Sequence, residues 1–70
     1  MRLDSAMRIA IEIGRQAGLN MEVVKAWYGE AVLGEMRIGE FFERIGRSIT
    51  DPALLSTFTE LKRSLPMMNS

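Results

Sequence analysis

Two kinds of side chain in this sequence could do chemistry, and both lack suitable partners. Glu40 and Glu43 lie about one helical turn apart, so they could work as acid and base or bind a cation. Arg44 and Arg47 follow them at i,i+4 spacing, so we expect salt bridges on a solvated helix face instead. The chain has no His and no Cys, which removes the common ways of activating a nucleophile. No base is then evident for Ser5, Ser48, Ser56 and Ser64.

The absence of His and Cys also excludes disulfides and zinc sites of the finger type. No Gly-rich phosphate loop is present. We therefore expect no catalytic residue, no cofactor-binding residue and no metal ligand, and we expect that the protein is not an enzyme. The function must then depend on binding.

The length and charge of the chain limit what it can bind. Its 70 residues include nine basic and nine acidic side chains, so the net charge is zero. A chain of this length forms one domain with a marginal core. Since disulfides and zinc are excluded, we expect self-association, most simply a homodimer, to supplement that core. No apolar run spans a membrane and no signal-peptide core is present, so we expect a cytoplasmic protein.

The elements that must position any binding residues are helices. Apolar periodicity predicts an all-α compact bundle of three to four short helices and no strand. We expect one helical domain over residues 1–65 and a flexible C-terminal tail over residues 66–70. Gly18 and Gly34 mark helix ends. An alternative joins the second and third helices into one long helix through Gly34 and Gly39.

The helix starts are also marked in the sequence. Asn20 is a good N-cap for the second helix, and the third begins near Arg37 or Ile38. Thr50 or Asp51 can cap the fourth, with a proline in its first turn. The first helix, residues 3–17, has an apolar arc wider than one neighbour needs. We expect it to touch two surfaces, or a second copy of the protein.

The stretch from residue 10 to residue 29 carries the most specific local pattern. Gly14 is a small residue where a second helix could cross closely, and Gly18 is a turn glycine. Apolar residues fill the inward positions, namely Ile13, Ala17, Leu19, Val24 and Trp27. The stretch resembles the helix-turn-helix of small phage and bacterial repressors. The resemblance implies that the second helix reads DNA, with contacts from Arg15, Gln16, Asn20, Lys25 and Tyr28.

The aromatic residues offer a different surface. Two consecutive Phe on a helix, Phe41 and Phe42, point about 100° apart, so we expect one of them to reach an interface. Tyr28 beside Trp27 presents the same problem. Met21 falls on the outer face of the second helix, and Met suits adaptable protein recognition. We therefore predict a partner-binding surface that contains Met21, Tyr28 and Phe42.

Charge distribution decides between the two functions. Positive and negative side chains alternate along the predicted helix faces, and no concentrated basic stripe is present. We therefore predict a small non-enzymatic regulatory protein that binds or occludes a partner protein, like a phage- or plasmid-type regulator or inhibitor. The alternative is a helix-turn-helix transcription regulator that binds duplex DNA. The expected partners are a second copy, an unidentified protein and, under the alternative, DNA, but no membrane.

Overall fold

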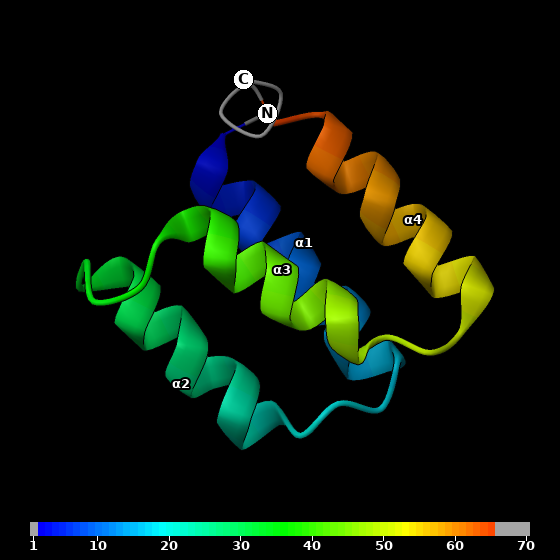
Figure 1. Ribbon diagram of the computed structural model, residues 1–70, viewed down its shortest axis with the longest axis horizontal. Coiled ribbons are helices and arrows are strands. Elements are labelled where there is room, and N and C mark those ends of the chain that lie inside the picture. Colours follow the sequence, from blue (N-terminus) through cyan, green and yellow to red (C-terminus); the bar gives the residue numbers. More distant parts are fainter. Residues whose placement is uncertain (1, 66–70) are drawn as a thin grey trace.

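The computed structural model describes residues 2–65, which form four helices and no strand. The helices are α1 (Leu3–Gln16), α2 (Met21–Val32), α3 (Ile38–Ser48) and α4 (Pro52–Arg63). Consecutive helices run in opposite directions, with α1 behind α3 and with α2 and α4 on the two flanks (Figure 1). The all-α prediction is confirmed. The tail predicted over residues 66–70 lies outside the described residues.

Glycines end the first two helices, as the sequence predicts. Gly18 and Gly34 both have φ near 80°, a left-handed conformation that favours glycine. After Gly34 the N–H of Glu35 donates to the Glu30 carbonyl at 2.8 Å, which closes the end of α2. The alternative that joins α2 and α3 through Gly34 and Gly39 is therefore wrong.

Side-chain caps start two of the helices. Asn20 Oδ1 accepts a hydrogen bond from the backbone N–H of Glu22 at 3.0 Å, at the start of α2. Asp51 Oδ1 accepts from the N–H of Ala53 at 2.8 Å, and Pro52 is the first residue of α4. Each cap satisfies N–H groups that have no partner within the helix. The predicted cap at Asn20 is confirmed, and of the two candidates for the fourth helix, Thr50 and Asp51, the cap is Asp51.

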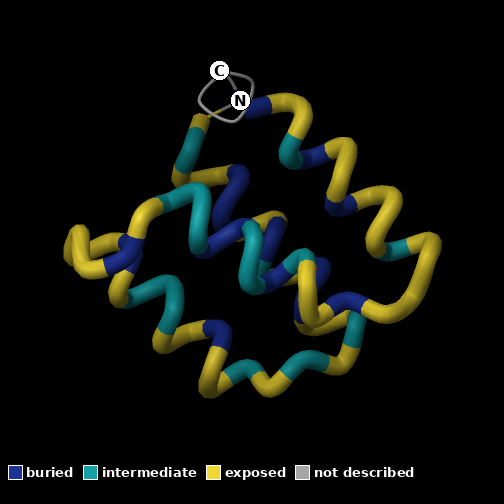
Figure 2. The backbone as a smooth tube through the Cα atoms, viewed as in Figure 1, coloured by how far each residue is buried: buried dark blue, intermediate teal, exposed yellow. Residues whose placement is uncertain are grey.

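The first helix packs against all three of the others. Three of its buried residues are small and are spaced by four, Ala6, Ala10 and Gly14, and the larger Met7 and Ile13 are buried beside them. Residues four apart lie on one helix face, so the three small residues let neighbouring backbones approach α1 closely. Figure 2 shows the buried positions gathered on the inner sides of the helices. The wide apolar arc of α1 therefore touches several surfaces of its own chain, as expected, although Ile9 on the same helix stays 41% exposed.

Three phenylalanine rings form the centre of the core. Phe41 and Phe42 are fully buried and Phe58 is 1% exposed. The Phe41 and Phe42 rings meet edge to face with centroids 5.5 Å apart, and Phe58 lies 6.2 Å from Phe42. The expectation that one of the consecutive rings reaches an interface is wrong. Because α3 contacts α1, α2 and α4, its buried arc is wide enough for both.

Candidate partner-binding surface

Apolar residues that no neighbouring helix covers stand on more than one side of α2. Val23 is 41% exposed, Val32 is 60% exposed, and Leu33, which caps the end of the helix, is 75% exposed. The inner side holds the buried Val24 and Ala31. Since α2 lies on a flank of the bundle, only part of this apolar helix is covered (Figures 1 and 2).

A hollow of about 190 Å³ lies beside Val23, where the start of α2 meets the end of α3. For comparison, an apolar cavity of about 150 Å³ can hold one benzene molecule. The hollow therefore has room for a single ring or branched aliphatic side chain. The residues that line it are Leu19, Asn20, Val23, Val24, Trp27 and Ser48.

The two polar residues of the hollow are engaged within the protein. Asn20 Oδ1 caps α2, and Ser48 Oγ donates to the Arg44 carbonyl at 2.9 Å. The Arg44 guanidinium carbon lies 5.8 Å from the centroid of the Trp27 ring, which is a cation–π arrangement. The hollow therefore offers a guest mainly apolar contact, with the half-buried Trp27 as its one aromatic wall.

The structure separates the three residues predicted to bind a partner. Met21 and Tyr28 are half-buried on α2. The Tyr28 hydroxyl donates to Asp4 Oδ1 at 3.2 Å, and its ring lies 6.1 Å from the Phe41 ring. Phe42 has no exposed surface, because its ring is buried in the core. The prediction that Phe42 contacts a partner is therefore wrong.

Sequence reasoning missed the exposed apolar residues of α2. Val23, Val32 and Leu33 were not among the predicted contacts, although they belong to the helical segment with the most apolar positions. That composition was the available signal. It shows that some apolar residues must remain uncovered, but it does not show on which side of the helix they lie.

Two of the residues predicted to touch DNA are held by a carboxylate on their own helix. Arg15 Nε donates to Glu12 Oε1 at 3.1 Å, and Gln16 Nε2 donates to Glu12 Oε2 at 3.3 Å. These hydrogen bonds, that from Arg15 above all, lower the pKa of the Glu12 carboxyl, and the same contact raises the pKa of Arg15. An anion that approached Arg15 would meet this carboxylate as well.

The other three residues predicted to touch DNA lie along α2 and its cap. The Asn20 side-chain oxygen caps the helix and the Tyr28 hydroxyl is bonded to Asp4. Lys25 is exposed, and it makes no ion pair among residues 2–65. Of the five, only Lys25 therefore offers a cation that no neighbouring carboxylate engages.

The small residue of the predicted helix-turn-helix faces a different neighbour from the one expected. A Cβ added at Gly14 would lie 3.3 Å from Leu19 Cδ1 and 3.7 Å from Ile45 Cγ2. Leu19 belongs to the turn and Ile45 to α3, so the nearest contacts of Gly14 do not come from α2. The N–H of Leu19 also donates to the Gly14 carbonyl at 3.0 Å, which fixes the turn over this glycine.

Comparisons of this chain with protein-family models, curated proteins and solved structures found no match. The candidate site is therefore defined by the geometry of this chain alone. Within the described residues, no helix is both long and apolar enough to cross a membrane. No group of three or more His, Cys, Asp and Glu residues in that same range could hold a metal ion.

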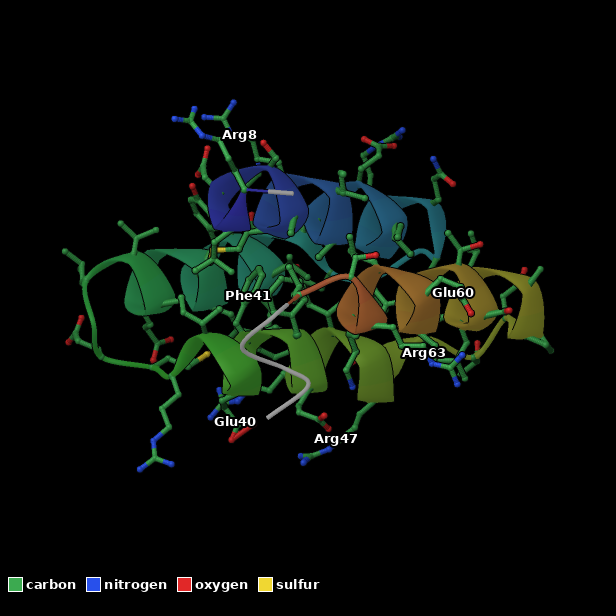
Figure 3. The ribbon with its side chains drawn as sticks, turned by 90° about the horizontal axis from the view of Figure 1, so that it is seen from above. Arg8, Glu40, Phe41, Arg47, Glu60 and Arg63 are labelled. Carbon is green, nitrogen blue, oxygen red and sulfur yellow. The ribbon has the colours of Figure 1, made fainter. Side chains whose placement is uncertain are left out.

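The paired carboxylates on α3 are engaged in ion pairs. Arg44 Nε lies 3.8 Å from Glu40 Oε2, and Arg47 Nη2 lies 3.9 Å from Glu43 Oε2. Both ion pairs are those that the i,i+4 spacing predicts. Glu43 also accepts a hydrogen bond from Lys62 Nζ of α4 at 2.9 Å, which the sequence did not predict. This bond lowers the pKa of the Glu43 carboxyl, with a smaller contribution from Arg47. Figure 3 shows Glu40 and Arg47 pointing outward from α3, away from the rest of the bundle.

Proposed function

We propose that this protein is a small protein-binding module without enzymatic activity, which regulates a partner by covering part of the partner's surface. The observation that carries the proposal is the apolar hollow between α2 and α3, next to the exposed Val23. The guest is one apolar side chain, aromatic or branched aliphatic, that protrudes from the partner. Trp27 is the contact that we expect to contribute most, since buried Trp often dominates binding energy.

The chemistry of the described residues agrees with a binding role. The carboxylates at positions 12, 40 and 43 face cations rather than each other, so they do not form an acid and base pair. The Ser48 hydroxyl, which lines the hollow, donates to a backbone carbonyl. The chain has no His, which is the side chain that most often activates a serine hydroxyl.

Recognition of duplex DNA stays the alternative prediction. No contact in the described residues favours it, since four of its five residues already serve the fold or a neighbouring carboxylate. Its expected signature is a strongly salt-dependent association with duplexes of mixed sequence, which fluorescence anisotropy measures directly.

The test compares two variants that differ only in the position of a new charge. Val23→Asp places a carboxylate in the hollow, and Leu55→Asp places one on α4 at a residue of similar exposure, 38% against 41%. A partner is first captured by the tagged full chain in the cells that produce it, then purified and titrated calorimetrically. We expect Val23→Asp to weaken binding by tenfold or more, an effect of about 1.4 kcal/mol, and Leu55→Asp to leave it unchanged.

Circular dichroism of both variants supplies the control for folding. Equal affinity of the two variants for the purified partner would overturn the proposal that the hollow is the binding site. Anisotropy of the wild-type chain with a labelled duplex at low salt forms the second arm. DNA association that disappears in Lys25→Ala but persists in Val23→Asp would favour the alternative function.

A further inference from the structure

We propose that the outer face of α2 is also a self-association surface, along which two copies of the chain pair with their α2 helices parallel. Leu33, at the C-terminal end of α2, is 75% exposed and points directly away from the bundle, while Val32, which is 60% exposed, lies at the edge of this face. This proposal goes beyond the hollow and does not depend on a second kind of protein. It names the face that would carry the homodimer expected from the length of the chain.

The positions on α2 define a narrow contact face. At 100° per residue, Ala26 and Leu33 point to the side opposite the buried Val24 and Ala31. Lys25 and Glu30 then lie on the two flanks of that outward line, one on each side. Both charged residues lack an ion-pair partner within residues 2–65. A helix neighbour on this face would therefore meet Ala26 and Leu33 in the middle, and Lys25 and Glu30 at the two edges.

These two charges are complementary in one orientation only. Consider two copies whose α2 helices are parallel and related by a two-fold axis. The flank of one helix that carries Lys25 then lies beside the flank of the other helix that carries Glu30. The two residues are five apart, the spacing at which flanking side chains of parallel coiled coils meet across the seam. In an antiparallel pair, Lys25 would lie near the partner's Lys25, and the glutamates would also meet. Charge therefore selects the parallel arrangement.

The residues on the outward line have opposite effects on the strength of the dimer. Ala26 and Gly29 are small, so the two backbones can approach closely. Nothing lies within 4 Å of a Cβ added at Gly29, so the centre of this face is open in the single chain. Glu22 occupies the N-terminal end of the same line, where the two copies would bring like charges together. We therefore expect a weak dimer that becomes tighter when Glu22 is replaced by Ala.

Sedimentation equilibrium of the full chain at low salt tests the charge pairing. We expect Lys25→Glu and Glu30→Lys each to weaken dimerisation about tenfold, since each change turns two symmetry-related attractive contacts into repulsive ones. The double variant K25E/E30K should restore the wild-type dissociation constant. Single variants that leave it unchanged would exclude the parallel arrangement, because in an antiparallel pair each single change only replaces one like-charge contact with another.

A disulfide test fixes the orientation without using charge. The natural chain has no Cys, so Ala26→Cys introduces the only thiol. In a parallel pair residue 26 faces residue 26 of the other copy, so mild oxidation should yield a covalent dimer. Thr59→Cys on the exposed side of α4 is the matched control and should stay largely monomeric.

An apolar variant separates this surface from the hollow. Leu33→Asp should abolish dimerisation and leave the affinity for a captured partner protein unchanged, whereas Leu55→Asp should affect neither. A wild-type chain that sediments as a monomer up to millimolar concentration would overturn the dimer. That result would leave the proposed binding function standing, because the partner titration of Val23→Asp measures it separately.

Discussion

Gly46 of α3 makes room for a ring that belongs to α4. A Cβ at Gly46 would lie 3.2 Å from Phe58 Cε2, and the buried ring has little freedom to move away. We expect Gly46→Ala to destabilise the fold by about 1 kcal/mol, because overpacking exceeds the gain in helix propensity. Gly29→Ala, with open space at the same backbone geometry, should stabilise it by about 0.5–1 kcal/mol. Urea unfolding of both variants measures the difference, and equal shifts would contradict the role of Phe58.

Glu43 gives the fold a small dependence on pH. Its pKa lies below the ordinary value of 4.5, chiefly through the hydrogen bond from Lys62. The stabilisation is therefore complete above the unfolded-state pKa and is lost as the pH falls through the lower folded-state pKa. We expect Glu43→Gln to reduce stability at neutral pH by at most about 1 kcal/mol, since the side chain is partly exposed. The loss of stability caused by Glu43→Gln should be smaller at acidic pH than at neutral pH.

Urea midpoints at pH 7 and pH 3 check this expectation. Glu35→Gln is the matched control, because Glu35 lies in the turn after α2 and makes no ion pair among the described residues. The control should show the same difference between the two pH values as the wild-type chain. A pH dependence that is equally altered in both variants would exclude the Lys62 contact as its cause.

At the level of the helix, a single side chain starts α4. Asp51 Oδ1 accepts hydrogen bonds from the N–H groups of Ala53 and Leu54. We expect Asp51→Ala to cost about 1 kcal/mol, whereas Asp51→Asn should cost much less because the amide oxygen can still accept these bonds. Thermal unfolding followed by circular dichroism compares the two variants. A loss as large in Asp51→Asn as in Asp51→Ala would show that charge matters more than the cap.

Local chemistry made the helices predictable. The stops at Gly18 and Gly34 and the cap at Asn20 follow from the conformation or hydrogen bond that each residue type favours, within a few residues of chain. Side-chain pairing was less certain, since several partners lie within reach. Arg8 has a carboxylate four residues away on each side, and it pairs with Asp4, while Glu12 bonds to Arg15 and Gln16 instead.

Packing between helices was harder to predict, because the width of a buried arc depends on how many neighbours a helix has. Phe42 shows this directly. Its position beside Phe41 suggested a single inward residue, but contacts from three helices enclose both rings. The candidate site depends on the same information. Val23 and Leu33 are exposed because α2 lies on a flank of the bundle, and no local pattern in the sequence determines which helix takes that place.

For the whole molecule, Phe42 tests whether one core supports all four helices. Phe→Ala in a core costs about 3–5 kcal/mol, and a domain of this length has a total stability of the same order, at about 0.05–0.15 kcal/mol per residue. We therefore expect Phe42→Ala to be largely unfolded at 25 °C. Far-ultraviolet circular dichroism and the emission of Trp27 should lose their native signals together. A folded Phe42→Ala chain would contradict the central place of this ring.

The ends of the described chain meet at one end of the bundle, where α1 begins and α4 leads to Leu65 (Figure 1). These two helices contact each other and run in opposite directions. A force that pulled residue 2 away from residue 65 would therefore act first on the end of the α1–α4 contact. The two helices would then separate one turn at a time from that end. In that geometry only a few side-chain contacts between α1 and α4 bear the applied force at any moment. In an optical trap the bundle should yield at low force, at a rate set by its unfolding barrier.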